Sequence, residues 1–349
     1  MADLKKEIPK LNIMHSMNNQ PDLMQTFKEI VGENGIAAVK KVHEQILGLK
    51  HTDGVIYSAL EYFAETILHS GLPVFPALLS LSCEAVGGKT EKTTSIGAAL
   101  TLVAIAADVH DDIIDESIVK YGKKTIVGQF GRDVALLAGD ALILHGLVLL
   151  NRECESLSKQ QKEAIMGMTS DAVLEISNAE ISETVLRKKH DLTPEEYFEI
   201  IRQKAVVSEV HCKIGGVLGN ADPATVDALG RYGQAFGVAS TIRDEFIDLI
   251  EQPELLSRMT HECPPLPILY ALRNKNIRPK VEKLIANSRI TEKMVNEIVN
   301  LILDSAEVQE LRKDFIVEIN RGLQAIAFVK NETVAENLRI MITAMGEGL

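Results

Sequence analysis

The sequence lacks several features that would place a protein in a common functional class. Its four cysteines, Cys83, Cys154, Cys212 and Cys263, show no C-x-x-C spacing, so neither a zinc site nor a disulfide framework is indicated. We therefore expect a reducing, cytoplasmic environment. Basic residues are also scarce, because 37 of them stand against 49 acidic residues and the net charge is −12. That balance argues against a nucleic-acid binder that uses a basic face.

Long hydrophobic runs are missing as well. The N-terminus has no apolar signal-peptide core, and the apolar runs near residues 96–107 and 141–150 are shorter than the roughly 20 residues that a membrane-spanning helix needs. We expect no membrane span. No strand pattern, internal repeat or low-complexity linker is present. Apolar residues instead recur at intervals of three and four, which predicts one all-helical domain, residues 21–349, after a loose arm, residues 1–20.

The most informative stretch covers residues 95–117. Small and apolar residues there lead directly into DVHDDIIDES, which predicts a buried helix with an acidic end. Asp111 and Asp115 are four residues apart, so they share a helix face and lie about 6 Å apart along the axis, with Asp108 and Asp112 close by. Burying several carboxylates without a counter-charge is costly, so the stretch indicates a bound cation. The absence of a nearby cysteine favours Mg²⁺ or Mn²⁺.

A second acidic cluster occurs in the stretch STIRDEFIDLIEQ, where Asp244 and Asp248 are four residues apart and Glu245 follows Asp244. Taken alone, this cluster is explained equally well by a solvated polar face. Two such clusters, each within an apolar helix, favour a shared site in which Mg²⁺ bridges carboxylates and a polyphosphate. The basic residues that could complete this site are Lys89, Lys92, Lys120, Lys204 and Arg258.

Two other carboxylate chemistries fit less well. A glycosidase needs one pair of carboxylates, not several on each of two helices. Di-iron helical bundles use Glu with E-x-x-H pairs, and no such pair accompanies these clusters. The apolar helix before Asp111 would supply a dry channel for an apolar substrate tail, which favours a substrate with a polyphosphate head and a hydrocarbon tail.

These residues resemble the trans-isoprenyl diphosphate synthase (polyprenyl synthetase) family over roughly residues 75–275. The first aspartate-rich motif of the family, D-D-x-x-D, matches Asp111, Asp112 and Asp115. The second matches Asp244, Glu245 and Asp248, with Glu in place of the usual middle Asp. The residues between the motifs, from Gly122-Lys123-Lys124-Thr125 through Phe130-Gly131 to Leu137-Ala138-Gly139-Asp140, are also similar to the family. The resemblance implies a single large all-α helical bundle around a central cavity, of the isoprenoid synthase type.

The resemblance also implies an activity. An allylic diphosphate would bind the two acidic clusters through about three Mg²⁺ per active site and ionise, and isopentenyl diphosphate would then attack in a head-to-tail 1′-4 condensation. Asp111, Asp115 and Asp244 would be direct metal ligands and catalytic residues, and Asp112 and Asp248 would be ligands or partners of ligands. Lys120, Lys204 and Arg258 would hold the allylic diphosphate, with Lys204 contributing to catalysis. The family also implies a homodimer.

The departures from the family pattern concern the isopentenyl diphosphate site. The family binds this substrate with a Lys and an Arg of a G-G-K-x-x-R pattern, a His before the first motif and an Arg after it. The corresponding positions here are Lys89, Lys92, Ala104 and Tyr121, and of these only Lys89 is unchanged. This leaves two alternatives open: an enzyme that ionises the allylic diphosphate but uses another acceptor or cyclises it like a class I terpene synthase, and a non-catalytic subunit of a heteromeric synthase. The second ranks last, because the costly acidic residues persist.

The resemblance also bears on product length. In this family a bulky aromatic residue four or five positions before the first motif stops chain growth early. Ala107 and Ala106 occupy these positions here, which predicts a product of geranylgeranyl size or longer. Asp108 is unusual in so apolar a helix, and the sequence assigns it no role.

Overall fold

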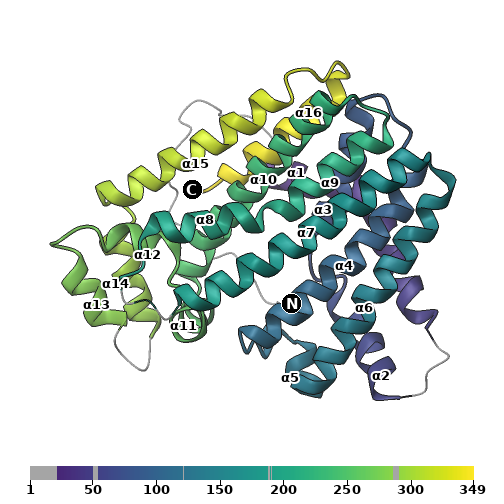
Figure 1. Ribbon diagram of the computed structural model, residues 1–349. Coiled ribbons are helices and arrows are strands. Elements are labelled where there is room, and N and C mark those ends of the chain that lie inside the picture. The colour runs from purple at the N-terminus through teal and green to yellow at the C-terminus, as the bar shows by residue number, and fades with distance from the viewer. Residues whose placement is uncertain (1–21, 50–53, 121, 188, 190, 286–290) are drawn as a thin grey trace.

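The computed structural model describes residues 22–49, 54–120, 122–187, 189, 191–285 and 291–349. The expected N-terminal arm and Tyr121 lie outside these residues. The described chain is almost entirely helical, as predicted (Figure 1). It also contains a short antiparallel hairpin, in which Val119–Lys120 (β1) pairs with Lys123–Lys124 (β2). The prediction of no strand was wrong here, because two-residue strands are too short to show an alternating pattern.

The described residues of the first half of the chain form seven α-helices and three short helical turns. They are α1 (Leu23–Leu47), α2 (Val55–Tyr62), a π-helical turn (Phe63–Ile67), α3 (Val74–Ala85), a 3₁₀ turn (Thr90–Lys92), α4 (Thr93–Ile114), α5 (Ile126–Phe130), α6 (Arg132–Glu153), a 3₁₀ turn (Cys154–Ser156) and α7 (Lys159–Leu186). The acidic stretch predicted to be a helix end is indeed the end of α4, and Asp115 is its C-cap.

The second half continues with α8 (Pro194–Lys204), α9 (Val206–Leu218), α10 (Pro223–Ile250), α11 (Gln252–His261), α12 (Leu266–Ala271), α13 (Arg278–Ile285), α14 (Glu292–Ile302), α15 (Ala306–Ala325), α16 (Glu332–Thr343) and a final 3₁₀ turn (Ala344–Gly346). α8 and α9 follow each other directly and are separated only at Ala205, and α11 has a proline in its first turn. Pro253 is tolerated there because the first helical turn leaves its N–H groups unpaired.

Capping side chains fix the start of α8 and α10, two of the helices that carry the acidic and basic residues. The Thr193 hydroxyl accepts a hydrogen bond from the Glu196 amide at the start of α8, and the Glu196 carboxylate accepts one from the Thr193 amide. Asp222 accepts hydrogen bonds from the amides of Ala224 and Thr225 at the start of α10. Such caps stabilise a helix by about 1 kcal/mol. They therefore help to place Lys204 and Asp244, which lie further along these two helices.

The central helices pack closely through glycine. α4 packs against α6, α3 and α1, and α9 lies between α3 and α10. A Cβ atom at Gly146 of α6 would lie 2.9 Å from a methyl group of Val103 in α4, and one at Gly215 of α9 would lie 2.4 Å from the carbonyl oxygen of Leu79 in α3. Larger residues at these two glycines would push the helices apart.

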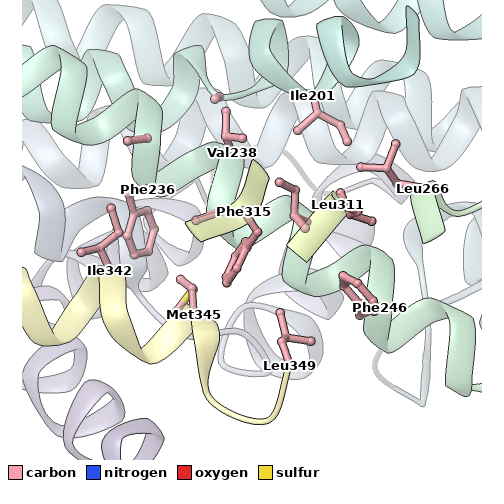
Figure 2. Close-up of a cluster of buried hydrophobic side chains, with 14 of the residues drawn as sticks. Ile201, Phe236, Val238, Phe246, Leu266, Leu311, Phe315, Ile342, Met345 and Leu349 are labelled. Atoms are coloured by element: carbon pink, nitrogen blue, oxygen red, sulfur yellow. The ribbon is translucent and has the colours of Figure 1, made fainter. Parts of the chain in front are cut away.

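The apolar core consists of two clusters. One lies around α10, α15 and α16, where residues such as Phe236, Phe315 and Ile342 interlock (Figure 2). The other lies around α4, α6 and α9 and includes Leu102 and Leu142. α3 and α9 contribute side chains to both clusters and so connect the two halves of the bundle.

Two segments are long and apolar enough to cross a membrane by length and composition alone, contrary to the expectation that none would be. They are Thr90–Ile114 and Arg132–Ser156, each of 25 residues. This is weak evidence for a membrane span, because a core helix passes the same test, and 56% of the apolar window in the first segment is buried inside the protein.

Candidate active site

The first acidic cluster lies at the C-terminal end of α4. Asp112 is buried, and burial, reinforced by the neighbouring carboxylates, raises its pKa to about 7 against the opposing effect of Lys120. Lys120 Nζ lies 2.5 Å from Asp108 and 3.6 Å from Asp112. This gives Asp108 the role that the sequence did not assign: it helps to hold Lys120 beside the cluster. Asp111 has a buried Oδ1 with no hydrogen-bond partner.

The second cluster, on α10, separates into residues with different roles. Glu245 is 2% exposed and accepts hydrogen bonds from Arg258, from the Tyr197 hydroxyl and from the amide of Leu266. This carboxylate is therefore already satisfied by protein donors and serves to tie α10 to its neighbours. Asp244, in contrast, has an exposed side chain. The protein around it removes part of its hydration, and this desolvation, together with the charge of Asp248, raises its pKa to about 7. Asp244 can therefore meet a ligand directly.

Arg258, predicted to hold a diphosphate, is instead bonded to protein through all three of its nitrogen atoms. Nη1 lies 2.6 Å from Asp248, Nη2 donates to Glu245 and Tyr197, and Nε donates to the Cys263 carbonyl and lies 3.2 Å from Glu262. The side chain is only 6% exposed. A diphosphate would have to break these bonds to reach it, so the structure favours Arg258 as the residue that orients the carboxylates of the second cluster.

Two glutamates of α7 join the site, and the sequence analysis missed them. Lys204 Nζ lies 3.0 Å from Glu180 and 2.6 Å from Glu183. Burial and the neighbouring Asp111 raise the pKa of Glu180 to about 8, which Lys204 partly offsets. The signal was present in the sequence AEISETV, where these acids are three residues apart within a long helix, but no aspartate-rich motif marks them.

The two acidic clusters face a common region. Arg187, at the end of α7, lies 3.4 Å from Asp115 and donates to the carbonyl of His261 at the end of α11. The next residue, Glu262, is close enough to Asp111 of the first cluster and Asp248 of the second that both, after burial, help to raise its pKa to about 7. The sequence prediction that the clusters belong to one site is therefore consistent with the structure.

A cavity of about 730 Å³ extends from the first cluster. Its polar end includes Asp108, Asp111 and Glu180, and its walls are apolar residues of α4, α7 and α9 and of the segment 71–76. This volume falls within the range of about 300–1,000 Å³ that is usual for small-molecule sites. None of the described residues that line it is Lys or Arg. The cavity thus has carboxylates at one end and mainly apolar residues along the rest of its wall.

The predicted residues around this cavity are only partly brought together. Ala107 and Ala104 line the cavity, whereas Ala106 is fully buried on another face of α4, within the apolar core. The 3₁₀ turn at Thr90–Lys92 precedes α4, so Lys92 is about 28 Å from Asp111 along the helix at 1.5 Å per residue. Lys89 is exposed at the same end, and Lys92 donates to the carbonyl of Ser156. The prediction that Lys89 and Lys92 hold a diphosphate beside the aspartates does not fit this placement.

The acidic residues can be tested for their fit to a metal ion. Among the described residues, no three His, Cys, Asp or Glu side chains are arranged to hold a metal by themselves. Mg²⁺ does not require such a cage, because it commonly binds one or two carboxylates and completes its shell with water and substrate phosphates. The buried, unpartnered Oδ1 of Asp111 and the accessible Asp244 are hard oxygen donors of the type that it prefers. The residues present therefore fit Mg²⁺ shared with a diphosphate.

Comparisons with known proteins agree with this arrangement. Residues 57–302 match the polyprenyl synthetase family. A short chain isoprenyl diphosphate synthase of Methanothermobacter thermautotrophicus is 28% identical over 68% of this chain and 69% of its own length. An octaprenyl diphosphate synthase of Escherichia coli is 25% identical over 67% and 71%. The crystal structure of geranylgeranyl pyrophosphate synthetase from Pyrococcus horikoshii has the same fold, with a TM-score of 0.80 and 22% identity over 93% of this chain and 99% of that one. The all-α isoprenoid synthase fold and the two aspartate-rich clusters thus have one explanation, which is that this chain belongs to the polyprenyl synthetase family of prenyltransferases.

Proposed function

We propose that the protein is a Mg²⁺-dependent polyprenyl diphosphate synthase that ionises an allylic diphosphate and condenses it head to tail, 1′-4, with isopentenyl diphosphate. The observation that carries this proposal is the position of Asp111. Its buried Oδ1 accepts no hydrogen bond from a protein donor, and Asp111 lies at the polar end of an apolar cavity. The charge of Asp111 also acts on Glu262, which Asp248 of the second cluster affects as well. The relatives named as isoprenyl and octaprenyl diphosphate synthases support the same reaction.

The metal ligands in this proposal are Asp111, Asp112, Asp115, Asp244 and Asp248, holding about three Mg²⁺ by family resemblance. Bound Mg²⁺ would neutralise the charge that develops on the departing diphosphate. Arg258 would position Asp248, and Arg187 would position Asp115, because each guanidinium already contacts its carboxylate. The aspartates would otherwise repel one another across the site.

Lys204 and Lys120 have complementary roles in binding the allylic diphosphate. Each ammonium group is surrounded by carboxylates that keep it charged, with pKa values raised above the usual range despite the opposing effect of burial. Because neither lysine lines the apolar cavity, their charge would act on the diphosphate head and leave the hydrocarbon tail in a dry environment. Ionisation would therefore occur next to fixed positive charge, with water excluded from the allylic cation.

The cavity wall would determine product length. Ala107 lies one helical turn before Asp111, with Ala104 and Val103 a further turn away, and all three line the cavity. Small residues at these positions leave room for a growing chain, which supports a product of geranylgeranyl size or longer. Ala106 is not part of this wall, so the length-determining role expected for it passes to Ala107.

A second candidate function is supported by one specific observation. The described cavity lining contains no Lys or Arg that could bind a second diphosphate. An enzyme that ionises the allylic diphosphate but uses another acceptor, or cyclises the cation, would need no such group. A non-catalytic subunit is less well supported, because it would have no reason to retain the buried and mutually repelling carboxylates.

We also propose that the protein is a cytoplasmic homodimer. All four cysteines are buried free thiols, as expected in a reducing environment. α6 and α7 each carry a stripe of exposed apolar residues with identical spacing: Leu137, Leu144 and Val148 on α6, and Leu174, Ile181 and Val185 on α7. Exposed apolar stripes of this kind are the surface that a second copy of the chain would cover.

The experiment that tests the reaction is a product analysis with labelled isopentenyl diphosphate, Mg²⁺ and one of geranyl, farnesyl or geranylgeranyl diphosphate. Elongated diphosphates are the expected products. Hydrocarbons, alcohols or prenylated acceptors without elongation would replace the leading proposal with the second candidate. No release of pyrophosphate from any allylic substrate would contradict both.

A further inference from the structure

A histidine lies in the wall of the cavity, away from the acidic residues. His211 of α9 is 2% exposed, and the Phe75 ring stacks on it with ring centres 5.3 Å apart. Its Nδ1 lies 2.7 Å from the carbonyl oxygen of Val207, one turn earlier in the same helix. A carbonyl oxygen can only accept a hydrogen bond, so Nδ1 carries the proton. The other ring nitrogen, Nε2, is consequently an unprotonated acceptor.

Nε2 of His211 has no partner in the protein. Among the described cavity-lining residues, buried side-chain atoms without a hydrogen bond occur at two places, Asp111 Oδ1 and His211 Nε2. The hydroxyl groups of Thr101, Thr169 and Thr184, which also line the cavity, donate to carbonyl groups of their own helices. Asp111 belongs to the diphosphate end of the site. Nε2 of His211 is therefore the unpartnered acceptor among the described side chains that line the apolar part.

The charge of His211 and of its surroundings limits what such a ligand can be. Burial lowers the pKa of the imidazole to about 4, so the ring is neutral at physiological pH and cannot attract an anion. The Phe75 ring that stacks on it is apolar, as are Leu72, Pro73 and Val74 in the same cavity wall, and the described cavity lining contains no Lys or Arg. A ligand that matches this wall is uncharged and donates one hydrogen bond.

The position of His211 suits a molecule that reacts with the allylic donor. Lys204, which marks the diphosphate end, precedes His211 by seven residues, or about 10 Å along the helical path, and Val207 lines the cavity between them. This distance leaves room for the reacting carbon of the donor and for a small acceptor molecule that touches the imidazole.

We propose that the protein has a further activity, the prenylation of an uncharged acceptor whose hydroxyl or N–H group is bound by Nε2 of His211. The inference rests on the donor half of the proposed function, the ionisation of an allylic diphosphate, and goes beyond its use of isopentenyl diphosphate. In the reaction, the bond between C1 and the diphosphate oxygen breaks and its electron pair leaves with the diphosphate. A lone pair of the acceptor oxygen or nitrogen forms the new bond to C1, and the acceptor proton passes to Nε2 and from there to water after product release.

The test uses the full-length protein with Mg²⁺ and farnesyl diphosphate, and offers 4-methylphenol as the acceptor probe, with and without isopentenyl diphosphate. Prenylated probe is the expected product of the wild-type protein. His211→Leu removes the acceptor atom, and the ratio of prenylated probe to elongated diphosphate should fall at least roughly a hundredfold, the lower range for loss of a general base. His211→Gln retains a hydrogen-bond acceptor without a base, so KM for the probe should be preserved while kcat falls.

A matched control is available in the same chain. His145 of α6 also has a buried, unpartnered Nε2, but it does not line the cavity. His145→Leu should leave the product ratio unchanged, and thermal unfolding of all variants would show that they fold. Elongation of isopentenyl diphosphate with no prenylated probe, or an equal ratio in wild type and His211→Leu, would overturn this proposal and leave the proposed function intact. No pyrophosphate release from farnesyl diphosphate would instead refute the function on which it rests.

Discussion

Nη1 of Arg258 lies 2.6 Å from Oδ2 of Asp248. The same guanidinium binds Glu245 and lies against Glu262, so one buried cation holds three carboxylates from α10 and the segment after α11. This arrangement explains how the second acidic motif accommodates Glu in its middle position. The longer side chain of Glu245 turns into the protein and stabilises the packing of α10 against α11 through Arg258. Asp244 remains accessible for a ligand.

The first prediction concerns the buried pair itself. Glu245→Ala leaves the Arg258 guanidinium without its most buried partner, and breaking such a pair costs about 3 kcal/mol or more in the free energy of unfolding. Urea denaturation would measure the loss. Glu297→Ala provides the control, because its ion pair with Lys293 is exposed and should contribute less than about 1 kcal/mol. Equal effects of the two substitutions would contradict a structural role for Glu245.

The second prediction concerns the proposed metal ligands. Asp111→Asn and Asp244→Asn each replace a charged oxygen by a neutral amide, and we expect pyrophosphate release to fall by about 10²-fold or more at every Mg²⁺ concentration. The exposed Asp171 of α7 gives a matched control, since Asp171→Asn changes the net charge equally without touching the site. Substantial turnover in both site variants would rule out the proposed diphosphate clamp.

These residues show how far the sequence predicted the site. The aspartates at 111, 112, 115, 244 and 248 could be found because a four-residue interval in a helix is a local pattern. Glu180 and Glu262 could not, because their interaction with Asp111 depends on where the fold places α7 and the segment after α11 relative to the end of α4. Lys89 and Lys92 were assigned from a short G-G-K motif, and the length of α4 separates them from the cluster.

The fold, like the site, was predictable where it depends on local helical spacing and not where it depends on tertiary packing. Helix periodicity predicted the all-helical class and the buried helix with an acidic end, which is α4. The break between α8 and α9 at Ala205 could not be predicted, because no Gly or Pro marks it. Which face of α4 meets the cavity also depends on tertiary packing, so the sequence could not distinguish Ala106 from Ala107.

The third prediction uses that distinction. Ala107→Phe places an aromatic ring in the cavity one turn below Asp111, and we expect the main product to become shorter than that of the wild type. Ala106→Phe inserts the same ring into the packed core between α4 and its neighbours, so it should destabilise the protein by about 1–3 kcal/mol and leave product length unchanged. Chromatography of the dephosphorylated products would compare the two. Shortening by Ala106→Phe alone would reverse the assignment of the wall.

The fourth prediction follows from the buried neutral state of His211. Its pKa falls from 6.5 in the unfolded chain to about 4 in the folded one, so between these values the unfolded state binds the extra proton. The free energy of unfolding is therefore not reduced by His211 above pH 6.5. It falls as the pH is lowered from 6.5 toward 4, by about 3 kcal/mol at most. Urea denaturation at several pH values should show this loss in the wild type. His211→Leu should remove that part of the pH dependence, and an unchanged profile in the variant would show that other groups cause the acid sensitivity.

The fifth prediction concerns the apolar stripes of α6 and α7. Leu144 is 65% exposed at the centre of its stripe, and a second copy of the chain would bury it against apolar neighbours. Leu144→Glu should therefore place a charge without a partner in the interface and shift the protein from dimer to monomer, as sedimentation velocity or native mass spectrometry would measure. Val317→Glu on α15 introduces the same charge at a residue that is 55% exposed and lies outside both stripes, so it should leave the mass unchanged. A monomeric wild type would contradict the homodimer, and a dimer that survives Leu144→Glu would place the interface on another surface.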